Sequence, residues 1–247
     1  MAEGPLAGRT IVVTRPEGQA GSLVGRLEEL GATVALVPLV GIEPIDDVSE
    51  LDAALGDPGY RWVIFTSANG VVAAERALAG KALGAAKVAA VGPATAEAVR
   101  ALGVEATFVP TVFAAEEIAA GLGPIQGARV LLPQADIASP ELAVELRDRG
   151  ATVDSIAAYR SVAVEPPPAE REELERGPDA IVLASGSAAR NLAALRVWLD
   201  GRTLLVCIGR KTAEAVRAVG LPVGLVADEA TTEGIIQALT SHFGESQ

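Results

Sequence analysis

The heptapeptide Thr-Ala-Glu-Ala-Val-Arg-Ala occurs twice in this chain, at residues 95–101 and 212–218. A second pair of matching segments, 8–43 and 127–162, shares a Gly-Ala-Thr-Val signature. The two kinds of segment alternate, so the order along the chain is A, B, A′, B′. A repeat of about half the chain predicts two similar lobes, because a solenoid repeats every roughly 20–50 residues.

The apolar runs of the chain are short and rich in β-branched residues, which is typical of strands buried on both faces. They occur at residues 10–13, 62–65, 128–132, 180–183 and 203–206. Stretches with helical spacing lie between them, and several end in glycine. This alternation predicts an α/β fold with parallel sheets covered by helices, in which ligands bind where strand ends meet helix starts.

Two segments, 40–47 and 161–168, interrupt this alternation, since each has a β-prone half followed by proline. They suit a pair of antiparallel strands that cross between the lobes and serve as a hinge. The lobes are then interleaved. The first lobe would contain residues 1–41 and 166–247, and the second would contain 42–165. Simple A-B and A′-B′ lobes are the topological alternative.

Composition excludes several classes of partner. The net charge of -12 and the aromatic content of 3% argue against nucleic acid. No apolar run reaches the roughly 18 residues of a membrane span, and residues 1–9 do not resemble a signal peptide, so we expect a cytoplasmic protein. Cys207 is the only cysteine and cannot form an internal disulfide. A small anionic substrate stays possible, because helix amides bind carboxylates locally.

The usual catalytic residues are missing. The only histidine, His242, stands near the end of the chain, which excludes histidine triads, histidine-rich metal sites and Cys-His pairs. The first strand is not followed by Gly-x-Gly-x-x-Gly, and no Walker loop occurs. Dinucleotides and ATP therefore lose their main support as ligands.

Small hydroxyl residues and glycines remain at the predicted strand ends as candidates for binding carboxylates. They are Thr14, Ser67, Thr95, Ser185, Gly186, Ser187 and Thr212. The alternative is that the hydroxyls only cap helices, worth about 1 kcal/mol each.

Two further residues suggest chemistry. Arg15 follows the first strand and is placed to bind an anion, and the alternative is a surface salt bridge. Tyr159 ends the predicted strand 154–158, just before the second crossing segment. Its phenol can donate a proton to a leaving hydroxyl, and the alternative is a packing role.

Several of these residues belong to motifs that appear in one order along the chain. They are the segments 13–16, 65–71, 91–96, 159–160, 185–192 and 208–213. With them the chain resembles the uroporphyrinogen-III synthase family, over residues 8–239.

The resemblance implies two flavodoxin-like lobes with parallel sheets, joined by a two-stranded ribbon linker, with the substrate in the cleft between them and no cofactor. In such enzymes hydroxymethylbilane loses water, and the electrophile is attacked at the substituted carbon of the last pyrrole. A spiro intermediate then reopens and closes with that ring inverted, giving uroporphyrinogen III. A self-contained pair of lobes makes a monomer the default expectation, and a further expected partner is the deaminase that forms the bilane, in a transient hand-over.

By the same resemblance, Tyr159 matches the family tyrosine that assists loss of the hydroxyl. Cleft-lining positions match Ser67, with Ala68 beside it, and Thr95, Ser185 and Thr212; neighbouring backbone amides would bind the carboxylates. The segment 133–138 departs from the family pattern, which puts a carboxylate contact there in doubt. The main alternative function is a two-lobed protein that binds or senses small anions without catalysis, and a scaffold for protein partners is a third.

Overall fold

The computed structural model describes residues 4–111, 115–199 and 201–244. It divides into two compact units, Met1–Gly41 with Val162–Gln247 (unit 1) and Ile42–Ser161 (unit 2). Residues 1–3, part of the N-terminal stretch considered above, lie outside the described residues. Unit 1 resumes at Val162, whereas we expected it to resume at 166, because the second crossing segment is a strand that belongs to both units.

Unit 1 contains a five-stranded sheet of order β10-β9-β8-β1-β2, in which each pair with a known register is parallel. Its strands are β1 (Thr10–Val13), β2 (Thr33–Leu36), β8 (Ala180–Leu183), β9 (Leu204–Cys207) and β10 (Leu225–Val226). Its helices are α1 (Glu17–Glu29), α7 (Pro168–Glu175), α8 (Gly186–Ala194), α9 (Arg210–Ala218) and α10 (Thr232–Gly244).

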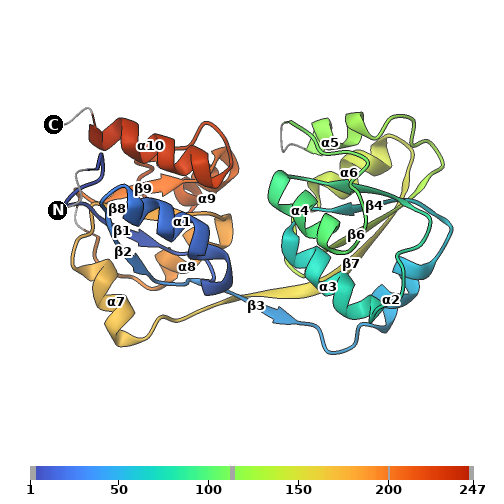
Figure 1. Ribbon diagram of the computed structural model, residues 1–247, viewed down its shortest axis with the longest axis horizontal. Coiled ribbons are helices and arrows are strands. Elements are labelled where there is room, and N and C mark those ends of the chain that lie inside the picture. The colour runs from blue at the N-terminus through green and yellow to red at the C-terminus, as the bar shows by residue number, and fades with distance from the viewer. Residues whose placement is uncertain (1–3, 112–114, 200, 245–247) are drawn as a thin grey trace. The chain divides into compact units, whose positions relative to one another are not determined.

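Unit 2 contains a second five-stranded sheet, of order β3-β7-β6-β4-β5. Its strands are β3 (Val40–Pro44), β4 (Tyr60–Phe65), β5 (Lys87–Ala90), β6 (Arg129–Ala135) and β7 (Thr152–Ala163). Its helices are α2 (Ser49–Gly56), α3 (Ala68–Leu78), α4 (Pro93–Ala101), α5 (Ala115–Gly121) and α6 (Glu141–Asp148). In both units helices flank the sheet (Figure 1), so the predicted α/β class with parallel sheets is confirmed.

Four strands of each sheet have the same order because the two units combine the repeated segments in the same way, whereas the fifth strand differs: β10 lies beside β9 in unit 1, and β3 lies beside β7 in unit 2. Segment A supplies β1 and β2, which lie beside β8 and β9 of segment B′. Segment A′ supplies β6 and most of β7, which lie beside β4 and β5 of segment B. The chain enters unit 2 through β3 and leaves it through β7, so these paired strands run in opposite directions and form the two-stranded ribbon linker.

A glycine stands two residues after each heptapeptide, and the structure explains why glycine is needed there. Gly103 and Gly220 adopt φ values of 77° and 78°, just after the ends of α4 and α9. Only glycine takes this left-handed conformation without steric cost. The repeat therefore preserves the way the helix ends as well as its sequence.

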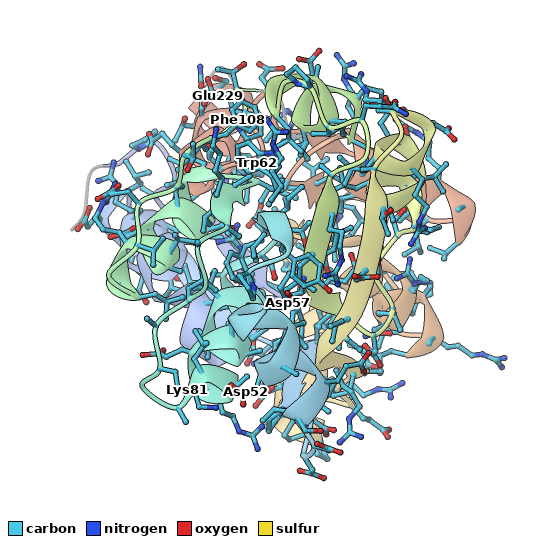
Figure 2. The ribbon with its side chains drawn as sticks, turned by 90° about the vertical axis from the view of Figure 1, so that its right-hand side faces the viewer. Asp52, Asp57, Trp62, Lys81, Phe108 and Glu229 are labelled. Atoms are coloured by element: carbon cyan, nitrogen blue, oxygen red, sulfur yellow. The ribbon has the colours of Figure 1, made fainter. Side chains whose placement is uncertain are left out.

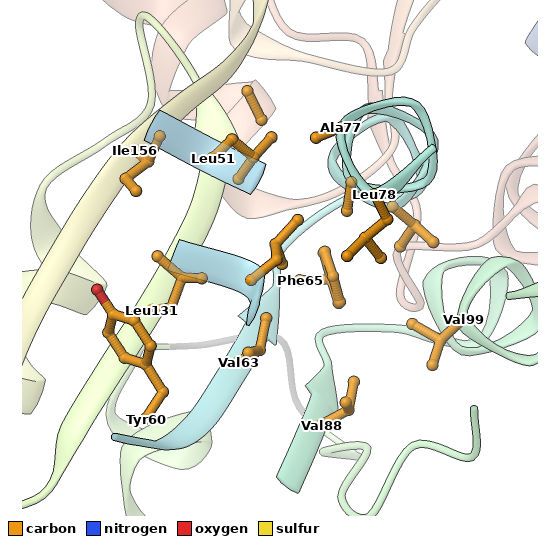
Figure 3. Close-up of a cluster of buried hydrophobic side chains, with 14 of the residues drawn as sticks. Leu51, Tyr60, Val63, Phe65, Ala77, Leu78, Val88, Val99, Leu131 and Ile156 are labelled. Carbon is orange, nitrogen blue, oxygen red and sulfur yellow. The ribbon is translucent and has the colours of Figure 1, made fainter. Parts of the chain in front are cut away.

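The core of unit 2 follows the period of two residues along its central strand. Val63 and Phe65 point into a cluster with α2, α3 and α4 (Figure 3), whereas Trp62 and Ile64 point into a cluster with α5 and α6. Tyr60 lies on the same face as Val63 because the pairing of β4 with β6 shifts register between Tyr60 and Trp62. Apolar side chains thus cover both faces of this sheet, as the continuous apolar runs predicted.

Ion pairs fasten the helices of unit 2 at the surface. Lys81, which follows α3, donates to Asp52 of α2 at 2.6 Å, and the two residues are labelled side by side in Figure 2. Such exposed pairs contribute little stability, typically about 0–1 kcal/mol. The buried clusters therefore carry most of the stability of the unit.

Candidate functional site

A bulge in β7 sets the direction of the Tyr159 side chain. Gln134 of β6 pairs with Ala157, but the next residue, Ala135, pairs with Tyr159, so two residues of β7 oppose one of β6. Without this shift Tyr159 would point to the opposite face from Ala158. With it, Ala158 and Tyr159 both lie on the face covered by α2, α3 and α4. We had predicted that Tyr159 ends the strand, but β7 continues through it to Ala163.

Ser67 meets Tyr159 on that face. It is the N-cap residue of α3, and its Oγ accepts a hydrogen bond from Gly70 N at 3.2 Å. The same Oγ lies 2.9 Å from the Tyr159 hydroxyl, and either atom can be the donor. Gly70 permits this arrangement, because a Cβ there would lie 2.9 Å from the carbonyl oxygen of Pro133 on β6. Two predicted site residues, far apart in sequence, are therefore in direct contact.

A pocket of ≈ 200 Å³ adjoins this pair within unit 2. Its wall comes from β3, the turn before α2, helix α3 and the bulged part of β7. The lining residues are Ile42, Pro44, Val48, Asn69, Val72, Ala73, Arg76, Ala158 and Tyr159. Of these residues, only Tyr159 was predicted from the sequence as a site residue. The others come together through the pairing of β3 with β7, and no sequence motif marks them.

The equivalent position in unit 1 has the same local structure. Ser185 caps α8 by accepting a hydrogen bond from Ala188 N at 3.1 Å, and its backbone angles match those of Ser67 within 1°. Gly186 begins the helix, where a Cβ would lie 3.1 Å from the Cβ of Ala215 on α9. The hydroxyl of Ser187 accepts a hydrogen bond from Arg190 at 3.0 Å. Both serines are helix caps, as the alternative interpretation held, and Ser67 has the additional contact with Tyr159.

Thr95 and Thr212 are buried in the first turns of α4 and α9, with exposures of 6% and 5%. The helices themselves begin two residues earlier, at Pro93 and Arg210. Their N-cap residues are glycines, which provide no side-chain hydrogen bond to the helix. The open backbone N–H groups at such helix starts favour anions, because the helix dipole adds a partial positive charge.

Arg15 lies in unit 1 between β1 and α1. Its Nη1 donates to the hydroxyl of Thr232, the first residue of α10, at 3.2 Å. It forms no ion pair with any carboxylate of the described residues, so the predicted alternative of a surface salt bridge is not what the structure contains. Burial lowers the pKa of this guanidinium from its ordinary value, yet the group stays charged at neutral pH. A half-buried cation without a counter-ion is a candidate anion site.

Two features noted in the sequence, Thr14 and the segment 133–138, have structural roles. The hydroxyl of Thr14 is buried and donates to the carbonyl of Val182 at 2.8 Å, so it ties β1 to β8. In the segment 133–138, Asp136 N donates to the carbonyl of Tyr159 at 3.0 Å, and its carboxylate accepts from Ser161 N at 3.0 Å. Asp136 therefore fastens the backbone of β7 at the end of the bulge and just after it, and its amide is not open to a carboxylate.

A second polar cluster lies at the other end of the unit 2 strands. Arg129 at the start of β6 contacts Asp57 at 2.7 Å and Asp154 at 3.1 Å, and it lies over the ring of Tyr60. The Tyr60 hydroxyl donates to Asp154 at 2.6 Å. Burial, followed by this hydrogen bond, raises the pKa of Tyr60 to about 12. The hydrogen bond from Tyr60 is also the main reason that the pKa of Asp154 is lowered. Sequence reasoning missed this network, which joins strands distant from the Tyr159 end.

Neither a metal-binding cluster nor a membrane-spanning helix occurs among the described residues. No group of three or more His, Cys, Asp and Glu side chains there is arranged to hold a metal ion. None of the helices in the described part of the chain is both long enough and apolar enough to cross a bilayer.

The fold defines a protein of two α/β units, each with helix N-termini and hydroxyl side chains at the ends of its strands. A sequence model described as uroporphyrinogen-III synthase HemD matches residues 21–237. The chain belongs to the uroporphyrinogen-III synthase family.

Curated relatives carry corresponding names. The chain is 30% identical over 246 residues to the porphyrin biosynthesis protein HemD of Ruminiclostridium josui, covering 95% of this chain and 49% of that protein. It is 35% identical over 170 residues to the uroporphyrinogen-III synthase of Synechococcus elongatus, covering 65% of this chain and 64% of that protein. The chain thus spans about half the length of the first relative and less than two thirds of the second.

Solved structures share the fold. A mutant uroporphyrinogen III synthase of Thermus thermophilus has a TM-score of 0.66 at 22% identity, and the alignment covers 97% of this chain and 100% of that one. The uroporphyrinogen-III synthetase of Helicobacter pylori has a TM-score of 0.62 at 17% identity, covering 93% and 97%. At these identities the likeness establishes the architecture.

Proposed function

We propose that this protein is a uroporphyrinogen-III synthase, a lyase of tetrapyrrole biosynthesis that closes hydroxymethylbilane with inversion of its last ring. Membership of the family supports the reaction. The observation that carries the site is the contact between the Tyr159 phenol and Ser67 beside a pocket of unit 2.

The hydrogen bond between Ser67 and Tyr159 can run in either direction, because a serine hydroxyl has one proton to donate and two lone pairs that accept. In the proposed arrangement Ser67 donates its proton to the Tyr159 oxygen. The phenol proton is then free for the leaving hydroxyl of the substrate. In the proposed step Tyr159 donates this proton as the C–O bond breaks, and the pyrrole nitrogen supplies the electron pair that replaces the bond. The last pyrrole returns a proton when it regains aromaticity, which restores the phenol.

The carboxylates of the substrate would be bound by the remaining predicted residues. Arg15 supplies a cation without a carboxylate partner, and the first turns that contain Thr95 and Thr212 supply backbone amides. The first turns of α3, from Ala68, and of α8, with Gly186 and Ser187, would add further amides. These contacts act over short distances. Salt screens the repulsion from charges more than about 10 Å away, so the net charge of -12 opposes the binding of the carboxylates only weakly.

Positioning is the main demand of this chemistry. The free bilane closes spontaneously to the unrotated isomer, so the protein must hold the chain of pyrroles such that attack at the substituted carbon is faster. Several dispersed carboxylate contacts serve this purpose better than a single strong one.

We further propose that the enzyme works as a cytoplasmic monomer and receives the bilane from the deaminase that forms it. A single, buried cysteine fits a compartment in which disulfides do not form.

The test supplies hydroxymethylbilane generated in situ and separates the uroporphyrin isomers after oxidation. We expect isomer III with the protein and isomer I without it. Isomer I alone in both reactions would refute the proposal and favour the alternative of an anion-binding protein without catalysis. Boiled protein serves as the control for trace contaminants in the substrate preparation.

A further inference from the structure

The pocket beside Tyr159 has the properties of a site for one flat, mostly apolar ring with one negative charge. Its volume of ≈ 200 Å³ is below the range of about 300–1,000 Å³ that binds a drug-sized molecule. A whole linear tetrapyrrole is far too large for it. One pyrrole with its short side chains is of suitable size.

The wall of the pocket is mainly aliphatic. Six of the lining residues have apolar side chains without aromatic rings, namely Ile42, Pro44, Val48, Val72, Ala73 and Ala158. Val72 is 60% exposed on α3 and leaves apolar surface for a ligand to cover. The faces of a pyrrole ring can pack on such side chains and remove this surface from water.

Arg76 gives the pocket a positive charge. Its Nη1 donates to the carbonyl oxygen of Ile45 at 2.9 Å, which directs the guanidinium along the turn before α2. No carboxylate of the described residues forms an ion pair with it. A guanidinium has five N–H donors in a planar fork, so it keeps donors that match a carboxylate after bonding one carbonyl. Each pyrrole of the bilane bears one acetate and one propionate, and either provides that carboxylate.

Tyr159 decides which ring fits best. It lines the pocket, and its hydroxyl is held by Ser67. A ring seated against Val72 and Arg76 therefore has the phenol at its edge, where the proton of the dehydration step is needed. We propose that this pocket binds the terminal pyrrole that carries the hydroxymethyl group, with Arg76 binding one of its carboxylates. This inference rests on the proposed function and names the part of the substrate that unit 2 holds.

Retention of that ring has a consequence for the product. The electrophile formed by loss of water stays bound in the pocket, while the last pyrrole lies outside it and is free to turn. If the ring is held less firmly, the electrophile is released and closes in solution to isomer I. Pocket variants should therefore raise KM and increase the share of isomer I.

The experiment has a binding arm and a turnover arm. In the binding arm, porphobilinogen, a monopyrrole with one acetate and one propionate, is titrated into the full-length protein and followed by NMR or calorimetry. Val72→Trp fills the mouth of the pocket, and Val144→Trp is the matched control, since Val144 is an exposed valine of α6 outside the lining. We expect affinity to fall at least about tenfold in V72W and to be unchanged in V144W.

In the turnover arm, Arg76→Gln is compared with Arg61→Gln, which removes another exposed arginine of unit 2 that does not line the pocket. Loss of one charged hydrogen bond should raise KM about tenfold in R76Q, with more isomer I, and leave R61Q like the wild type. Circular dichroism checks that each variant is folded, and if V72W is not, R76Q is also titrated with porphobilinogen.

The outcomes separate the two proposals. Equal porphobilinogen affinity in V72W and V144W, no binding to the wild type, or an unchanged KM in R76Q would overturn the pocket assignment while isomer III formation still supports the enzyme. If the protein binds porphobilinogen in the pocket but forms no isomer III, the assignment of a pyrrole-binding pocket stands and the proposed reaction is refuted.

Discussion

At the scale of single residues, the contact between Ser67 and Tyr159 combines a structural and a chemical role. Ser67 caps α3, and the same oxygen holds the phenol. Ser185 has the same kind of cap in unit 1, which contains no tyrosine, since Tyr60 and Tyr159 both belong to unit 2. Comparing Ser67 with Ser185 therefore separates the effect of a helix cap alone from the effect of a cap that also positions a phenol.

The two tyrosines of the chain provide the first prediction. Tyr159→Phe should lower kcat by roughly 10²-fold, because general acid catalysis typically contributes at least that factor. Tyr60→Phe is the control: it should reduce the free energy of unfolding by about 1–3 kcal/mol through loss of the bond to Asp154, with kcat unchanged. Both are measured by the isomer assay and urea unfolding. Equal kcat in Y159F and the wild type would return Tyr159 to a packing role.

The two serine caps provide the second prediction. Ser67→Ala and Ser185→Ala should each reduce the free energy of unfolding by about 1 kcal/mol, since both remove the same kind of cap. Ser67→Ala should also lower kcat about tenfold, because Tyr159 loses the partner that orients its proton. Ser185→Ala should act on KM. Steady-state kinetics distinguish the two, and identical kinetic effects would argue against a special role of Ser67.

At the scale of elements, unit 2 separates its polar clusters between the two ends of its strands. Ser67 follows the carboxyl end of β4, and Tyr159 pairs with Ala135 at the carboxyl end of β6, which is the edge where parallel α/β sheets bind ligands. Arg129 and Tyr60 lie at the amino ends of β6 and β4. The first cluster faces a pocket, whereas the second joins neighbouring strands, which indicates stability rather than catalysis.

The amino-end network predicts a dependence of stability on alkaline pH. The pKa of Tyr60 is raised from about 10 in an unfolded chain to about 12 in the folded protein. A raised pKa contributes stability that is full below about pH 10 and is lost as the pH rises towards about 12. Urea unfolding between about pH 8 and about pH 12 should show this loss in the wild type, and Tyr60→Phe should show less of it. An equal loss of the free energy of unfolding with rising pH in the wild type and in Tyr60→Phe would show that Tyr60 is not its cause.

At the scale of the whole molecule, the repeat and the topology agree only when the segments are interleaved. Each unit joins an A-type segment to the B-type segment from the other half of the chain. Unit 2 is continuous in sequence, whereas unit 1 needs residues from both ends of the chain. This difference has a consequence for folding.

A fragment of residues 40–163 should fold alone, because it contains the entire β3-β7-β6-β4-β5 sheet and two buried clusters. We expect helical and strand content by circular dichroism, a cooperative urea transition, and no formation of isomer III. A fragment of the same length that starts at residue 1 divides both sheets and should not unfold cooperatively. If the second fragment folds and the first does not, the compact units are assigned incorrectly.

The sequence by itself determined the features that depend on near neighbours along the chain. The apolar runs predicted the buried strands, the serines at 67 and 185 marked helix starts, and the heptapeptide showed the duplication. Backbone conformations and periodic burial impose these patterns within a few residues, so they are visible without a structure. The exact first residues of α4 and α9 were less visible, since Pro93 and Arg210 precede the threonines that we had emphasised.

Only the tertiary structure decided how Tyr159 is aimed and which residues surround it. The bulge arises where β7 shifts its pairing with β6, and it moves the phenol to the face that carries Ser67. The pocket with Arg76 forms because β3 lies at the edge of the same sheet, beside β7. A shift of one residue in strand pairing reverses the direction of a side chain, and pairing joins segments more than a hundred residues apart, so no local pattern in the sequence encodes it.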